Sequence, residues 1–184
     1  MPHFHIPLQS GSDTVLSLMK RRYDTTLFRN KVELIRRIMP DAFIGVDVIV
    51  GTRGETDECF EEAYNFIASL PISQLHVFSY SERPGTAALE IPHVVDAPTK
   101  RERSRRLLAL SEEKRIAHYR RFIGETRTVL WEHQREGRPM MGWTDNYIRV
   151  EAVPGFDIAP DSLGQALLGY FNESGDALIA TPIL

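Results

Sequence analysis

Cysteine is nearly absent from this sequence, since Cys59 is the only one among 184 residues. A single cysteine excludes a disulfide framework within the chain and fits the reducing cytoplasm, where we expect the protein to be located. It also excludes an iron–sulfur cluster held by this chain alone, because such clusters need three or four thiolates. We interpret Cys59 as a buried core residue, and we predict no metal site.

Long apolar runs are also missing. None approaches the length of about 20 residues that a membrane-spanning helix needs, and the first residues lack the basic and apolar regions of a secretory signal. A strong charge of either sign is missing too, because the net charge is -3. Bulk charge therefore indicates neither nucleic acid nor a membrane as the partner. What remains is an ordinary globular composition, long enough for one domain or two small ones.

The first hundred residues alternate between strand and helix patterns. From about Thr26 to Pro40, apolar residues recur at i, i+4, i+7 and i+11, which predicts an amphipathic helix. The nearly continuous β-branched run Ala42–Val50 predicts a strand buried on both faces. The expected order is a strand at 4–8, a short helix to about 22, a helix at 26–39, a strand at 42–50, a helix at 57–70 and a strand at 74–80. This order is typical of parallel α/β architecture.

A long helix and a set of short strands follow. Thr99–Glu102 has the pattern of a capping box and predicts a helix that reaches about Arg121. This helix carries nine Lys/Arg and three Glu residues, so it could face phosphates, although a solvated helix face stays an alternative. Short strands at 125–133, 147–153, 166–171 and 177–180 predict a small β-barrel or sandwich. We place the domain boundary near Phe122.

Three strings put polar residues at the ends of the predicted parallel strands. The first is His5–Asp13, reading HIPLQSGSD, in which Gln9 and Ser10 could hydrogen-bond ribose hydroxyls. In α/β barrels, ligands bind where the parallel strands end at their carboxyl ends, which we call the mouth of the sheet. A turn and helix cap without any ligand remains an alternative. His3 and His5 share a strand face and could form half of a metal site, but the neighbouring sequence offers no further ligand.

The second string, Asp47–Thr56, reads DVIVGTRGET, and its glycines let the backbone approach a flat group such as adenine. The third, Leu75–Thr86, reads LHVFSYSERPGT and brings His76, Phe78 and Tyr80 to the same mouth. Taken together, the three strings resemble the radical S-adenosylmethionine (SAM) tRNA methylthiotransferases, which carry them in this order and at about this spacing. Residues 100–110 and 142–150 resemble the same family, and most of all the subgroup that methylthiolates N6-threonylcarbamoyladenosine in tRNA.

The resemblance implies a fold class and a domain organisation. Residues 1–98 would be the C-terminal half of a radical SAM (β/α) barrel, residues 99–122 a connecting basic helix, and residues 123–184 a small all-β TRAM barrel that binds RNA. The cofactors would be SAM and, in the full-length family, two 4Fe-4S clusters. The residues that we expect near SAM are Gln9, Ser10, Asp47, Ile49, Gly51, His76, Phe78 and Tyr80.

The RNA partner implied by the resemblance is the anticodon region of tRNA. The residues that we expect to contact RNA are Arg83, Arg127, Arg138, Trp143, Asn146, Tyr147 and Arg149. Aromatic and arginine side chains suit this task because they stack on unpaired bases. The alternative is that Trp143 and Tyr147 belong to the domain core, which the net charge of -5 over residues 122–184 favours.

The sequence departs from the family in two respects. The C-x-x-x-C-x-x-C loop and the three-cysteine domain are not in this chain, so we expect a C-terminal fragment that is inactive alone and pairs with the missing N-terminal half. Arg53 stands where the family usually has proline. Exposed strand edges could also lead to self-association.

A stand-alone RNA-binding module is the second hypothesis for the function of this chain. A hydrolytic α/β enzyme is a weaker third, because no nucleophile–histidine–acid set is evident.

Overall fold

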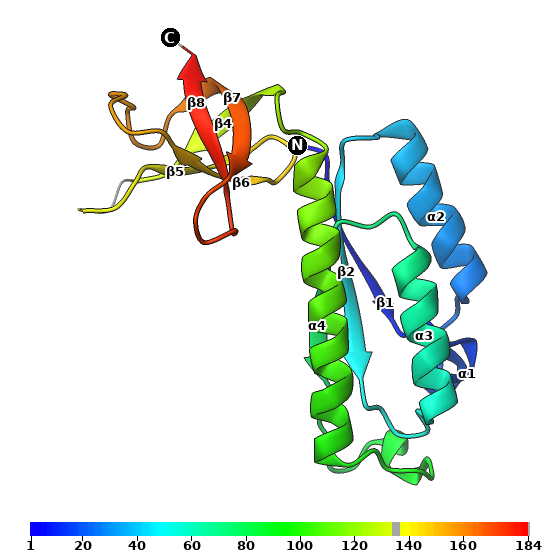
Figure 1. Ribbon diagram of the computed structural model, residues 1–184. Coiled ribbons are helices and arrows are strands. Elements are labelled where there is room, and N and C mark those ends of the chain that lie inside the picture. Colours follow the sequence, from blue (N-terminus) through cyan, green and yellow to red (C-terminus); the bar gives the residue numbers. More distant parts are fainter. Residues whose placement is uncertain (134–136, 184) are drawn as a thin grey trace. The chain divides into compact units, whose positions relative to one another are not determined.

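The computed structural model describes residues 1–133 and 137–183, which form two compact units (Figure 1). The sheet unit comprises Phe4–Pro40 and Ile44–Arg115, and the barrel unit comprises Met1–His3, Asp41–Phe43 and Ile116–Leu184. The elements are β1 (His3–Gln9), α1 (Asp13–Leu18), α2 (Thr25–Ile38), β2 (Phe43–Val50), α3 (Asp57–Ser69), β3 (Gln74–Ser79), η1 (Ala87–Glu90), α4 (Ala97–Arg120), β4 (Thr126–Trp131), β5 (Met141–Thr144), β6 (Arg149–Ala152), β7 (Leu163–Phe171) and β8 (Leu178–Ile183).

The sheet unit is built on three strands in the order β1-β2-β3. Strands β2 and β3 are parallel, as the sequence pattern predicted. Successive side chains of a strand alternate between the two faces, so Ile44, Val46 and Val48 of β2 point into one core, where residues of α2, α3 and α4 pack against them. The opposite face carries the half-buried Asp47 and Ile49. The mixed α/β character of this region is therefore confirmed.

Local capping chemistry sets the helix starts. The Asp24 carboxylate accepts a hydrogen bond from the Leu27 amide at 2.7 Å, and the Thr56 hydroxyl accepts one from the Cys59 amide at 3.2 Å. Both bonds satisfy amides that have no partner within the helix. Helix α4 starts earlier than the capping box predicted, because the Asp96 carboxylate accepts from the Thr99 amide at 2.7 Å.

Two further expectations for this region were wrong. Helix α1 ends at Leu18, about a turn before the predicted end. In α3, the buried residues are Phe60, Ala63 and Ile67, so the inner face of this helix does not include Cys59. Cys59 is consequently only half-buried and is not a core residue.

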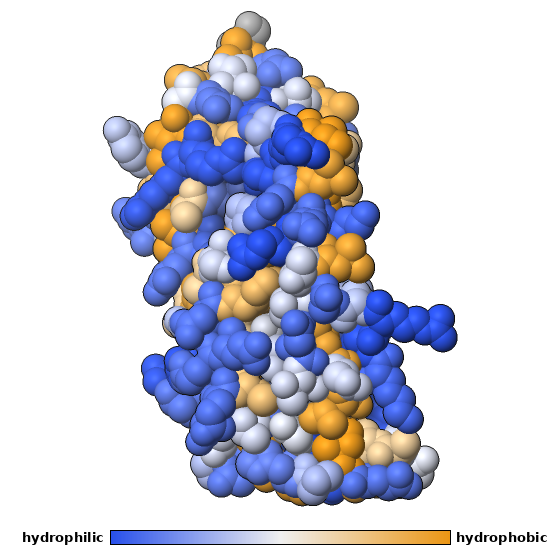
Figure 2. Space-filling view, turned by 90° about the vertical axis from the view of Figure 1, so that its right-hand side faces the viewer, coloured by the Kyte–Doolittle hydropathy of each residue, from blue (hydrophilic) through white to orange (hydrophobic). Residues whose placement is uncertain are grey.

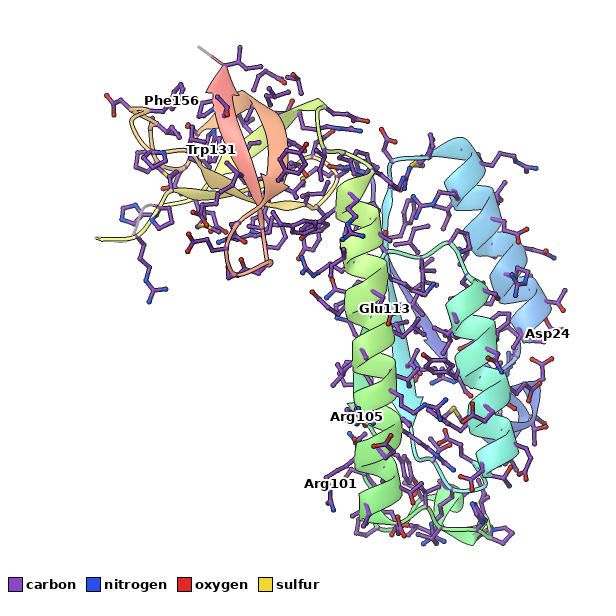
Figure 3. All side chains as sticks on the ribbon, viewed as in Figure 1. Asp24, Arg101, Arg105, Glu113, Trp131 and Phe156 are labelled. Atoms are coloured by element: carbon purple, nitrogen blue, oxygen red, sulfur yellow. The ribbon has the colours of Figure 1, made fainter. Side chains whose placement is uncertain are left out.

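The barrel unit contains a closed barrel with the strand order β4-β5-β6-β8-β7, which decides between the barrel and the sandwich that the sequence left open. Its core gathers around the fully buried Trp131, which lies among the strands in Figure 3. Strand β5 was not predicted, because it has only four residues and contains Gly142. A Cβ atom on Gly142 would lie 2.6 Å from a Val129 side-chain carbon, so glycine permits the close approach of β4.

The described part of the chain contains no helix long and apolar enough to cross a membrane. The side of the molecule that carries α2 and α3 shows mostly hydrophilic side chains, with apolar ones scattered among them (Figure 2). This pattern is that of helices whose inner faces pack on a sheet while their outer faces meet water.

Candidate functional site

The turn between β1 and α1 holds the first pair of predicted cofactor residues. Gln9 has a positive φ of 72° and is 9% exposed, and Ser10 is 2% exposed. The Ser10 hydroxyl accepts a hydrogen bond from the Ser12 amide at 3.2 Å, and the Ser12 hydroxyl donates to Glu62 at 2.6 Å. The turn is thus held in one conformation by its own side chains and by α3.

The loop between β2 and α3 is fixed by a buried carboxylate that the sequence did not single out as a site residue. Glu55, 2% exposed, accepts from the Gly51 amide at 2.9 Å and from the Arg103 guanidinium at 2.6 Å. Burial raises the pKa of the Glu55 carboxyl, while the bonds from Gly51 and Arg103 act in the opposite direction. Arg103 also pairs with Asp57 at 2.6 Å. Gly51 itself has a φ of 76°, a conformation that favours glycine.

Arg53 joins this loop to the segment that follows β3. Its Nε donates to Glu82 at 2.7 Å, and one terminal nitrogen donates to the carbonyls of Leu89 at 2.6 Å and Ile91 at 3.3 Å. The Arg53 hydrogen bond lowers the pKa of the Glu82 carboxyl. The residue that departs from the family pattern therefore fixes the segment at 82–91 beside the mouth of the sheet.

Two cavities open at this mouth, both within the sheet unit. The first, of about 360 Å³, is lined by the predicted cofactor residues Ile49, Phe78 and Tyr80 and by the predicted RNA contact Arg83. The second, of about 250 Å³, shares Ile49 and Tyr80 with the first and adds Arg53, among others. A mainly apolar cavity with a few convergent polar groups is the usual form of a small-molecule site.

Two further predicted cofactor residues, Asp47 and His76, lie on the sheet beside His5 and do not line these cavities. His5 makes a hydrogen bond with Asp47, and its ring lies 4.6 Å from that of His76. Asp47 and His76 are also partners in the register of β2 and β3. Across the described ranges, no group of three or more histidine, cysteine or acidic side chains is arranged to hold a metal ion.

Several arginines of α4 pair with neighbouring carboxylates. Arg106 pairs with Glu61, and Arg105 pairs with Glu102 at 2.7 Å. Arg101 and Arg105 come from neighbouring turns of the helix (Figure 3). Because these pairs lie within the sheet unit itself, the helix is less basic toward an incoming phosphate than its sequence suggests.

On the barrel, three predicted RNA contacts form one group. The rings of Trp143 and Tyr147 stack with centroids 4.6 Å apart, and the Arg149 guanidinium lies 4.9 Å from the Trp143 ring. Glu132 accepts from the Trp143 indole at 3.0 Å and pairs with Arg149 at 2.8 Å. Tyr147 is 37% exposed and Trp143 is half-buried, so this group, which we call the Trp143 cluster, lies at the barrel surface.

The other predicted RNA contacts lie elsewhere. Asn146 is fully buried, and its side-chain oxygen accepts from the Thr144 hydroxyl at 2.7 Å. Arg127 makes hydrogen bonds to Asp41 at 2.5 Å and to Glu125 at 2.9 Å. Arg138 is exposed in the segment before β5. The structure therefore brings together Trp143, Tyr147 and Arg149 but not the whole predicted set.

Comparison with known proteins gives a consistent result. Residues 1–67 match the family model of the Radical SAM superfamily. The Bacillus subtilis protein named threonylcarbamoyladenosine tRNA methylthiotransferase MtaB is 40% identical over 152 residues, covering 80% of this chain and 34% of the relative. A tRNA-2-methylthio-N(6)-dimethylallyladenosine synthase from Symbiobacterium thermophilum is 38% identical over 149 residues, covering 80% and 32%.

A synthase with the same name from Salinispora arenicola is 44% identical over 126 residues, covering 68% of this chain and 25% of the relative. The chain spans about a third of the length of the curated relatives from Bacillus and Symbiobacterium that it matches. These matches confirm the resemblance that the sequence motifs indicated, and the chain belongs to the radical SAM tRNA methylthiotransferase family.

Proposed function

We propose that this chain is part of a SAM- and iron–sulfur-dependent enzyme that methylthiolates N6-threonylcarbamoyladenosine in tRNA, next to the anticodon. The observation that carries the proposal is the 40% identity, over four fifths of the chain, to the Bacillus subtilis protein whose name states this reaction. The cavities at the mouth of the sheet add support, because they occur where an α/β barrel binds its ligands.

The residues at the mouth fit a nucleoside cofactor such as SAM. Ile49, Phe78 and Tyr80 offer apolar and aromatic surface to a flat base, and Ser10 and Gln9 end the neighbouring strand with polar groups. When bound, SAM supplies the radical and the methyl group of the reaction. The chain's own residues would bind and orient it and exclude water from it.

The described residues do not fit an iron–sulfur cluster. They include no suitable group of ligands, and Cys59 is the only cysteine. We therefore propose that the 184 residues alone do not catalyse methylthio transfer and that the cluster ligands come from an N-terminal half of the enzyme. Methylthio transfer to tRNA by the purified chain alone would contradict this part of the proposal.

We further propose that residues 123–184 form a TRAM domain that holds the tRNA, with residues 1–98 as the partial radical SAM barrel and 99–122 as the connecting helix. The closed five-stranded barrel and the Trp143 cluster support this, because small barrels bind single-stranded RNA by stacking bases on aromatic rings. Salt-dependent binding of a tRNA anticodon stem-loop is expected, and Trp143→Ala should weaken it by about tenfold. Arg37→Gln, on the exposed side of α2, is the matched control.

The catalytic proposal is tested with a chimaera in which this chain replaces the matching third of the Bacillus subtilis relative. We expect the chimaera to restore methylthiolated nucleosides in the tRNA of a strain that lacks the relative, measured by mass spectrometry. Ile49→Arg, which fills the cavity at the mouth, should abolish this activity. A folded chimaera that binds SAM but transfers no methylthio group would contradict the proposal.

A stand-alone RNA-binding module without catalysis is the second candidate, and the Trp143 cluster favours it equally. The two candidates differ in what they require at the mouth of the sheet. Measured SAM binding by the isolated chain, lost in Ile49→Arg, would support the enzyme. Strong tRNA binding by a chain that takes up no SAM would support the module.

A further inference from the structure

The cavity of about 250 Å³ has an unusual charge balance. Its lining includes two arginines, Arg21 and Arg53, and no aspartate or glutamate among the described residues. The remaining walls are mainly apolar and come from side chains such as Leu18 and Met19. A site of this kind suits a ligand with an apolar or flat body and one anionic group.

The polar groups of this cavity still have unused hydrogen-bonding capacity within the described residues. Arg53 uses Nε and one terminal nitrogen for Glu82 and the carbonyls of Leu89 and Ile91, and its second terminal nitrogen makes no hydrogen bond to a described residue. Arg21 is exposed and makes no ion pair with any described residue. Thr52 is 5% exposed, and its hydroxyl is buried without a partner in the described part of the chain.

An unsatisfied buried hydroxyl is costly, about 1–3 kcal/mol, and such groups in native proteins usually have a partner. A carboxylate entering the cavity could accept from Thr52 and from the guanidinium groups at once. Arginine is well suited to this because its planar fork matches the two oxygens of a carboxylate. Apolar walls would meanwhile enclose the rest of the ligand.

We propose that this cavity recognises the carboxylate of an acidic substituent on N6 of the substrate adenosine, and so selects acidic over neutral N6-modified adenosines. The proposal rests on the proposed function and names the determinant of its substrate choice. Arg53 would act as a positioned donor, fixed by Glu82, and the exposed Arg21 as a second cation.

The same carboxylate chemistry could come from the amino-acid part of SAM, and the experiment separates the two sources. The 184-residue chain is titrated by calorimetry with N6-threonylcarbamoyladenosine, with its carboxylate methyl ester, and with N6-dimethylallyladenosine. We expect the acid to bind at least tenfold more tightly than the ester and the dimethylallyl nucleoside. Equal affinities for the acid and the ester would overturn the proposal, as would absence of binding by all three.

Substitutions then locate the recognition. Arg21→Gln should reduce the preference for the acid by about tenfold, and leave the affinity for the ester unchanged, because hydrogen bonds between charged groups contribute about that much. Arg21 is exposed and makes no ion pair with the described residues, so this variant should keep its structure. Arg53→Gln should also reduce the preference for the acid by about tenfold. Because this substitution also loosens the segment at 82–91, circular dichroism must show that the variant is folded. Arg101→Gln on α4 is the matched control.

Adding SAM at saturation completes the test. If SAM leaves the affinity of the acidic nucleoside unchanged, the cavity belongs to the substrate. If SAM displaces the nucleoside and Arg21→Gln weakens SAM binding instead, the carboxylate is that of SAM and the proposal is wrong. If the original chain shows no preference for the acidic nucleoside while the chimaera still transfers methylthio groups, this inference alone is overturned and the proposed function stands.

Discussion

The two units stabilise their strands in different ways. The barrel unit closes five strands into a ring, so each strand pairs on both sides and the core around Trp131 is almost entirely apolar. The sheet unit has three strands, so β1 and β3 are edges. The apolar core of this unit lies on one face of the sheet, whereas Phe78 on the other face is 53% exposed. Its loops depend on the buried ion pair of Glu55 and Arg103. Closure makes the barrel self-sufficient, whereas the sheet retains surface that is free for ligands and partners.

The largest expected effect concerns the apolar centre of the barrel. Trp131→Ala should lower the free energy of unfolding by about 4 kcal/mol, because it removes a fully buried side chain and leaves a cavity. Hydrogen exchange, read separately for the two units, measures the loss. We expect faster exchange in β4–β8 and little change in β2 and β3.

Leu163→Ala is the matched control, since Leu163 lies on the same barrel but is 72% exposed. It should change stability by less than about 0.5 kcal/mol. If Trp131→Ala accelerates exchange equally in both units, the barrel is not self-sufficient and the contrast between the units fails.

The second effect concerns the polar support of the sheet unit. Arg103→Met should lower the free energy of unfolding by about 3 kcal/mol, because it leaves the Glu55 carboxylate buried without its cation. The double variant Glu55→Gln with Arg103→Met should be more stable than Arg103→Met alone, since no uncompensated charge remains. Urea denaturation compares the two.

Glu102→Ala provides the control, because the pair that Glu102 forms with Arg105 is largely exposed. Exposed pairs contribute at most about 1 kcal/mol. If Glu102→Ala lowered the free energy of unfolding as much as Arg103→Met, burial would not distinguish the contributions of these two ion pairs.

The same contrast explains which parts of the fold could be predicted from the sequence. Strand β2 and helix α2 were predictable because their apolar periodicity records which face is buried. Strand β5 was not, because four residues with a central glycine carry too little pattern, and its pairing with β4 depends on residues distant in sequence. Cys59 was expected in the core, but its neighbour Phe60 is the buried residue, because two adjacent apolar residues fit the helical period almost equally well.

For the site, the sequence predicted positions more readily than interactions. Ile49 and Tyr80 do line a cavity at the mouth, because strand ends in a parallel sheet meet at one edge. The sequence could not show that Glu55 would pair with Arg103, which is 48 residues away. It also could not show that Asn146 would be buried in the barrel, since its burial depends on the long-range pairing of the strands.

The third effect tests the open edges of the sheet. If β1 and β3 remain unpaired, the chain should self-associate through them, because an exposed strand edge accepts another strand. Phe78→Lys puts a charge on β3 and should weaken association by about tenfold, or about 1.4 kcal/mol. Sedimentation of the original chain and of Phe78→Lys over a range of concentrations gives their self-association constants. Leu130→Lys, on the closed barrel, should change them little, and a chain that is monomeric at all concentrations would contradict the prediction.

The smallest effect concerns a half-buried lysine that links α4 to the end of α3. Lys114 donates to the carbonyls of Ala68 at 2.9 Å and Leu70 at 2.8 Å, and burial lowers its pKa. Because the folded pKa lies below the ordinary value of 10.5, the unfolded chain binds more protons in the interval between the two values. The free energy of unfolding contributed by this group should therefore rise with pH across that interval.

Urea denaturation at pH values approaching 10.5 measures this rise, and Lys114→Met should remove it. The difference between the variant and the original chain isolates the lysine from the tyrosines that titrate in the same range. Lys31→Met, which replaces an exposed lysine of α2, should leave the pH profile of the original chain intact. An unchanged profile in Lys114→Met would mean that the end of α3 does not depend on this buried charge.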